Sequence, residues 1–287
     1  MASKRNASQT TGPELPLAAR FARHAVKPGQ PITLAHYDPG AKPFSSGDKA
    51  RDKTTIAELA ERINVWQDKL YAERRRRLLL ILQGTDTSGK DGTVRAVFSR
   101  VDPLGLRCVA FGVPSPAEAA RDYLWRVHRE VPAAGELAIF NRSHYEDVLV
   151  PRVHGSIDAA ECERRYAHIR DFERLLAETG TAIVKCFLHI GRDEQRARLQ
   201  ARLADPDKHW KFNPGDLAER AHWDAYMQAY EAVLPATSTP WAPWIVVPAD
   251  SKTHRNLMIA QLVESVLQAM APDYPPPRPE YATLQVD

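Results

Sequence analysis

The sequence has few cysteines and no cysteine pair. Its 287 residues include only three, Cys108, Cys162 and Cys186, which lie far apart. An odd number without a CxxC spacing argues against a disulfide framework and against a structural zinc site. These thiols are typical of a reducing compartment, so we expect a cytoplasmic protein.

Long apolar runs and charge of one sign are also missing. The opening stretch MASKRNASQTTGPEL has no apolar core of a signal peptide, and no later run approaches the ~18 apolar residues of a membrane span. The 39 basic and 36 acidic residues leave a net charge of +3, too little to attract nucleic acid by charge alone. We therefore expect no membrane and no nucleic acid as partner, and any anion site must come from local clustering.

What the sequence does contain is an alternation of apolar strands and amphipathic helices. Repeated βα units of this kind predict an α/β fold, in which helices cover both faces of a parallel sheet. Ligands bind such sheets at the carboxyl ends of the strands. The expected strands are 78–82, 107–112, 137–140, 182–190 and 244–247, and the expected helices start near 90 or span 116–129, 158–178, 193–204, 215–234 and 253–270.

The pattern predicts one domain with an extension at each end. Residues 1–53 are rich in Pro, Gly, Ser and Lys, which is typical of an extended arm. Residues 54–271 form the expected domain, whose first helix should start at a capping box made by Thr55 and Glu58. The remainder, 272–287, is a proline-rich tail.

The segment GTDTSGKDG (84–92) lies between a predicted strand and a predicted helix. Gly84, Gly89 and Lys90 satisfy the pattern G-x-x-x-x-G-K, in which backbone N–H groups surround a phosphate and the lysine supplies a point charge. We therefore expect a phosphate loop. The residues expected to bind phosphate here are Gly84, Thr85, Thr87, Ser88, Gly89, Lys90, Asp91, Gly92 and, further along the helix, Arg95.

The loop lacks the Ser or Thr that usually follows the lysine and binds magnesium, because position 91 is Asp. Asp86 and Asp91 would repel a phosphate unless a divalent cation lay between them. The two acids thus predict Mg²⁺ as cofactor, with Asp86 as its ligand. Asp91 also suits the first turn of a helix, where a negative side chain is favourable.

The strand at 137–140 runs into a polar cluster, NRSHYED (141–147). Asn141 takes the place where P-loop nucleotidases carry a magnesium-binding Asp. Arg142 could bind a phosphate and Glu146 a metal-bound water or a ribose, while an ion pair between these two side chains is an equal alternative. His144 is more typical of a hydrogen-bonded core residue than of a ligand.

Residues 192–216 predict a basic helical lid. Arg198 and Arg202 are four apart on one helix face, and Lys208 and Lys211 flank Trp210 in the segment DPDKHWKF. These cations would clamp phosphates on closure, whereas the alternative is a solvated helix with an ordinary charged face.

Four motifs, GTDTSGKDG, FNRSHYEDVLV, DPDKHWKF and APWIVVPADSK, occur in the order in which the polyphosphate kinase 2 family carries similar segments. The resemblance covers about residues 30–270. It implies a three-layer P-loop kinase fold like that of thymidylate kinase, with a helical lid. It also implies reversible, Mg²⁺-dependent phosphoryl transfer between inorganic polyphosphate and a nucleotide.

The same resemblance implies roles for individual residues. Lys90 and Asp86 match the family's phosphate-binding lysine and magnesium-binding aspartate, Arg142 its strand-end arginine, and Arg198 and Arg202 its lid arginines. FNRSHYED, with Asn141, is similar to the subgroup called class III, which accepts both AMP and ADP and would yield ADP and ATP. Asn141, Arg142 and Glu146 are thus expected to bind the nucleotide, and we expect a homo-oligomer, a dimer or a tetramer.

Two other functions fit the residues. The loop and lid would also serve an ATP-dependent kinase of nucleoside monophosphates or another small molecule, although Asn141 departs from that pattern. A non-catalytic regulator that binds nucleotide or polyphosphate would need the basic lid, but it would not need Asp86 together with Lys90.

Overall fold

The computed structural model describes residues 14–286, apart from the side chain of Lys211. Its centre is a five-stranded sheet in the order β2-β3-β1-β4-β5, and all four neighbouring pairs are parallel. The strands are β1 (Arg77–Gln83), β2 (Leu106–Ala110), β3 (Leu137–Asn141), β4 (Thr181–His189) and β5 (Trp244–Pro248). The five predicted strands are confirmed, with ends that differ by up to two residues.

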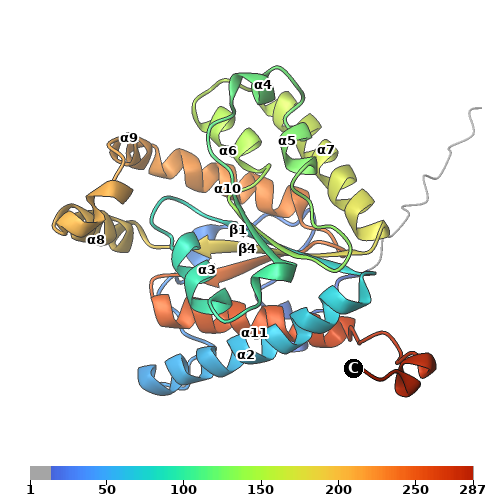
Figure 1. Ribbon diagram of the computed structural model, residues 1–287. Helices are drawn as coiled ribbons and strands as arrows, with labels where there is room; N and C mark the ends of the chain where they lie inside the picture. The colour runs from blue at the N-terminus through green and yellow to red at the C-terminus, as the bar shows by residue number, and fades with distance from the viewer. Residues whose placement is uncertain (1–13, 287) are drawn as a thin grey trace, which may run out of the picture.

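Both faces of the sheet are buried under helices, as Figure 1 shows. Along β1, Leu78, Leu80 and Leu82 pack in one core cluster, while Leu79 and Ile81 pack in the other, because successive side chains of a strand point to opposite faces. Helices α2 (Lys49–Glu73), α3 (Lys90–Phe98) and α11 (Lys252–Met270) contribute to the first cluster, and α6 (Glu146–Val153), α7 (Ala159–Glu178) and α10 (Trp223–Thr237) contribute to the second. The predicted α/β/α layers are confirmed.

Two predicted helices are each divided in two. The prediction of a helix at 116–129 is wrong, because α4 (Pro116–Ala119) and α5 (Trp125–His128) are separated by a turn in which the Asp122 carboxylate accepts from the Leu124 N–H. The helix expected at 215–234 is divided at His222 into α9 (Gly215–Ala221) and α10. The spacing of apolar residues does not reveal short polar breaks of this kind.

The start of α2 was also predicted wrongly. Thr55 and Glu58 lie inside this helix, which begins at Lys49 with Asp48 as its N-cap. The Asp48 carboxylate accepts hydrogen bonds from the N–H groups of Ala50 and Arg51, which satisfies two of the free donors of the first turn.

The two extensions lie against the domain in the described part of the chain. Between residues 14 and 48 the chain runs beside β5, where the Val26 N–H donates to the Trp244 carbonyl (2.8 Å) and the Val246 N–H to the His24 carbonyl (2.9 Å). In the tail, the Tyr274 hydroxyl donates to Asp68 of α2. The expectation about a signal peptide falls mostly on residues 1–13, outside the described residues. Among residues 14–286, no helix is long and apolar enough to cross a membrane.

Candidate active site

The phosphate loop joins the end of β1 to the start of α3. Gly84 (φ +153°), Thr87 (φ +61°) and Gly89 (φ +105°) turn the backbone sharply, and Gly89 caps the helix. A Cβ on Gly89 would lie 1.8 Å from Nη1 of Arg255, so both the positive φ and the space behind the loop require glycine. The loop therefore lies at the N-terminus of α3, where free N–H groups and the helix dipole favour an anion.

Lys90 is buried at the centre of this loop. Its ammonium donates to the carbonyl oxygens of Gly84 (2.7 Å) and Thr85 (3.2 Å). Burial, and then the nearby Arg142 cation, lower the pKa of Lys90 to about 8, although three carboxylates oppose the shift. A buried ammonium with only carbonyl partners is well placed to gain an anionic partner.

Two arginines support the loop from behind. Nη1 of Arg255 donates to the Ser88 carbonyl (3.0 Å), and Nη1 of Arg198 donates to the Thr87 carbonyl (2.9 Å). The other end of the Arg198 guanidinium holds the carbonyls of Ala249 (2.8 Å) and Asp250 (2.7 Å) after β5. Burial, and then Arg198, lower the pKa of Arg255 to about 9. Arg255 was missed by the sequence analysis, because it lies in the polar first turn of α11 (KTHRN), where nothing distinguishes it from its neighbours.

This geometry differs from the role expected for Arg198. Helix α8 (Arg192–Leu203) starts directly after β4, so its first turns lie beside the phosphate loop. The Arg198 side chain is only 9% exposed, and its donors hold backbone carbonyls and Glu194. In this structure Arg198 positions the loop instead of projecting into the solvent-facing side of the lid.

The other predicted phosphate-binding cations lie further out. Arg202 donates to Asp216 (3.3 Å) and Lys208 pairs with Asp205, while Arg95 is exposed on α3. The backbone of Lys211 ends the 3-10 helix Pro206–Lys211, and its side chain lies outside the description. Helices α8 and α9 project beyond the carboxyl ends of the strands, where a lid is expected (Figure 1).

The end of β3 brings Arg142 to the phosphate loop. Arg142 has φ +63°, and its guanidinium contacts Asp86 (2.7 Å) and Glu146 (3.3 Å). Although burial opposes it, the carboxylates of Glu146 and Asp86 raise the pKa of Arg142. Gln83 donates to the other oxygen of Glu146 (2.5 Å). Thus the ion pair between Arg142 and Glu146, one of the two alternatives, is present, and Asp86 shares it.

Asn141 and Asp91 also meet. The Asn141 amide donates to a carboxylate oxygen of Asp91 (2.6 Å), and Asp91 lies in the first turn of α3, as expected. The strand-end position that carries Asp in standard P-loop nucleotidases therefore holds a neutral donor facing an acid.

A buried polar network fixes the segment between Arg142 and Glu146. The Lys185 ammonium contacts Glu173 (2.6 Å) and the Tyr145 hydroxyl (2.9 Å), and His144 contacts Glu173 at 3.3 Å. All four side chains are fully buried, which confirms His144 as a hydrogen-bonded core residue. The pairing stabilises a polar turn that the core would otherwise exclude.

A cavity of about 460 Å³ lies in front of these residues. It is lined by Gly84, Thr85, Asp86, Arg142 and Glu146 and by residues of α9 and α10. The aromatic residues that line it are Trp223, Tyr226 and Tyr230, and the charged residues that α9 contributes are Asp216, Glu219 and Arg220. The sequence analysis missed the three aromatics, although their i, i+3, i+7 spacing places them on one helix face.

The chain is similar to known proteins over nearly its whole length. A family model described as Polyphosphate kinase 2 (PPK2) matches residues 46–275. An AMP/ADP-polyphosphate phosphotransferase of Meiothermus ruber is 48% identical over 255 residues, which cover 89% of this chain and 96% of that protein. An ADP-polyphosphate phosphotransferase of Rhodopseudomonas palustris is 39% identical, with 88% and 92% covered. The crystal structure of polyphosphate kinase 2 from Arthrobacter aurescens TC1 superposes with a TM-score of 0.86 at 45% identity, over 96% of each chain.

Proposed function

The chain belongs to the polyphosphate kinase 2 family, and from this premise we propose that it phosphorylates AMP to ADP and ADP to ATP with inorganic polyphosphate, reversibly and with Mg²⁺. One observation carries the proposal. A single cavity is lined both by the phosphate loop with Arg142 and by three aromatic side chains, as a nucleotide acceptor requires.

The acceptor would lie across this cavity. Its base would contact Trp223, Tyr226 and Tyr230, whose rings offer apolar area and, in the two tyrosines, a hydroxyl group. Its phosphate would approach Arg142, a planar guanidinium that can bind phosphate oxygens in a fork. Glu146 holds Arg142 in place and Gln83 holds Glu146, so the cation is oriented before the acceptor binds.

The donor's terminal phosphates would bind in the loop. The hydroxyl oxygens of Thr85, Thr87 and Ser88 are buried and have no hydrogen-bond partner among the described residues. Buried polar groups normally have partners, so three such hydroxyls together support binding of a phosphate. Lys90 would add its charge at the same place, which stabilises negative charge as the phosphoryl group moves.

The residues also fit a magnesium ion. Mg²⁺ is usually held by one or two carboxylates together with waters and substrate phosphates, and within residues 14–286 no cluster of three metal-ligating side chains occurs. Asp86 is the carboxylate that lines the cavity beside the loop, and we assign it as the ligand. When bound, the ion would neutralise charge between phosphates of donor and acceptor.

Transfer then needs little covalent work from the protein. An oxygen of the acceptor's terminal phosphate attacks the terminal phosphorus of the chain, and the bond to the next phosphate breaks, so the chain leaves one phosphate shorter. Lys90 and Arg142 neutralise charge on the two sides of the transferred group. Arg198 and Arg255 keep the loop carbonyls fixed, which preserves in-line geometry.

The direct test omits ATP. Purified protein is incubated with Mg²⁺, polyphosphate and either AMP or ADP, and nucleotides are separated by ion-exchange chromatography. We expect ADP and ATP from AMP, and ATP from ADP. Turnover of AMP only when ATP replaces polyphosphate would instead identify an ATP-dependent kinase, and binding without turnover would identify a regulator.

The homo-oligomer stays a prediction. Sedimentation velocity distinguishes a monomer of 32.2 kDa from the proposed dimer or tetramer.

A further inference from the structure

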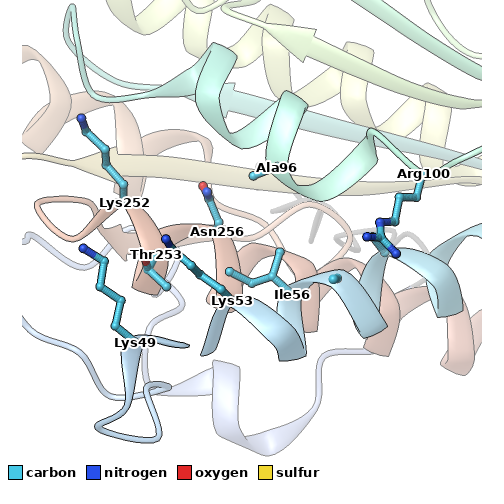
Figure 2. Close-up of a pocket in the computed structure, with 10 residues that line it drawn as sticks. Lys49, Lys53, Ile56, Ala96, Arg100, Lys252, Thr253 and Asn256 are labelled. Atoms are coloured by element: carbon cyan, nitrogen blue, oxygen red, sulfur yellow. The ribbon is translucent and has the colours of Figure 1, made fainter. Parts of the chain in front are cut away.

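A second cavity lies between α2, α3 and α11, and it is basic. Its volume is about 520 Å³, and Figure 2 shows lysines from α2 and α11 along its rim and an arginine at one end. The cations are Lys49, Lys53, Lys252 and Arg100, and the floor includes Ile56, Ala57, Ala60 and Ala96. No carboxylate side chain is among the residues that line this groove.

The positive charge of the groove is largely uncompensated. Arg100 pairs with Glu61 (2.7 Å), but within residues 14–286 Lys49, Lys53 and Lys252 form no ion pair. Three such lysines around one groove raise the local potential and attract an anion. A lysine ammonium is a compact charge that, unlike a guanidinium, has no fixed bidentate donor geometry. It therefore suits a chain of phosphates that binds in more than one position.

The groove lies next to the helix that follows the phosphate loop. Asn256, which lines it, accepts a hydrogen bond from the hydroxyl of Thr93 (3.3 Å), and Thr93 lies in the turn of α3 that follows Gly89. Lys49 and Lys252 also line an adjoining hollow of about 440 Å³. That hollow contains Lys42 and the acids Glu194 and Asp250, and the Asp250 carbonyl is the one that Arg198 holds.

We infer that this groove binds the part of a long polyphosphate chain that extends beyond the phosphates at the loop. The inference rests on the proposed function, and it adds a site that distinguishes long donors from short ones. Only a chain longer than the loop can reach Lys49, Lys53 and Lys252 while its end lies beside Lys90. Nucleic acid is a poorer fit, because no aromatic side chain lines the groove to stack on bases.

The test compares two donor lengths in one variant. The triple variant Lys49→Gln, Lys53→Gln, Lys252→Gln should raise KM about tenfold or more for chains of many tens of phosphates, since three cations that attract the chain are lost. For a short chain of a few phosphates, KM and kcat should stay as in the wild type. The plot of log KM against log salt concentration should also be shallower for the long chain, because fewer counterions are released.

A control variant separates the groove from net charge. Arg23→Gln, Lys27→Gln, Arg278→Gln removes three exposed cations from the arm and the tail, and it should leave both KM values unchanged. If the long-chain KM of the groove variant is unchanged, or if both donors are affected equally, or if the control has the same effect, the groove inference is overturned. If the wild type uses neither donor, the proposed function fails first and the inference fails with it.

Discussion

Exchange of Asn141 for Asp tests how the end of β3 sets acceptor choice. The Asn141 amide donates to Asp91 at 2.6 Å, so Asn141→Asp replaces a hydrogen bond by two facing carboxylates at nearly unchanged shape. The proposed enzyme uses both AMP and ADP, which differ by one charged phosphate. A second carboxylate at this point should therefore change the ratio of kcat/KM for ADP to that for AMP.

The magnitude follows from the contact. The lost hydrogen bond to a charged acceptor contributes about 1.5 kcal/mol, at the lower end of its range because both groups are partly exposed. Two carboxylates about 4 Å apart repel by about 1 kcal/mol in water and by about 4 kcal/mol at a protein surface. An added Mg²⁺ can relieve this repulsion, so the variant becomes more dependent on the metal.

We expect ADP to be affected more than AMP, because ADP brings an additional charged phosphate to the same place. At limiting Mg²⁺, the ratio of kcat/KM for ADP to that for AMP should fall about tenfold, which corresponds to 1.4 kcal/mol, and saturating Mg²⁺ should restore part of it. The assay measures both values with polyphosphate as the only donor, over a Mg²⁺ titration.

Asn141→Ala is the matched control, because it removes the hydrogen bond without adding charge. Its acceptor ratio should stay close to that of the wild type. The reasoning is refuted if Asn141→Asp leaves the ratio unchanged at every Mg²⁺ concentration, or if Asn141→Ala shifts it equally.

Three further predictions concern the phosphate loop. Lys90→Ala should lower kcat/KM about a hundredfold or more while circular dichroism stays native, and near-normal turnover would contradict the assigned role. Only protonated Lys90 carries the charge, and its pKa is lowered to about 8, so kcat/KM should fall as the pH rises through about 8. At saturating polyphosphate, kcat should hold to higher pH, because bound phosphates favour the ammonium form. If Lys90→Arg shows the same fall of kcat/KM above pH 8, the fall does not come from Lys90. Gly89→Ala should abolish activity and lower the free energy of unfolding, measured with urea, by about 2 kcal/mol or more, since the new Cβ would overlap Arg255. Gly92→Ala is the milder comparison, because a Cβ there would lie 3.2 Å from Arg255. Equal stability of the two variants would contradict the crowding argument.

The sequence by itself determined the fold class and the phosphate loop. The strand before the loop is apolar on both faces, which is typical of a sheet covered by helices on both sides. The pattern G-x-x-x-x-G-K follows it and places Lys90 next to a helix N-terminus without any long-range information. Such signals are local, because hydrophobic period and the conformational freedom of glycine act within a few residues.

Contacts between distant segments required the tertiary structure. Arg255 lies 167 residues from Ser88, and its contact with that carbonyl had no signal in the spacing of either segment. Arg198 illustrates the same limit, because helical periodicity placed it on a basic face but could not tell that this face lies against the loop. A guanidinium serves phosphate and backbone carbonyl equally well, so its partner is decided by which backbone the packed strands and helices bring within reach.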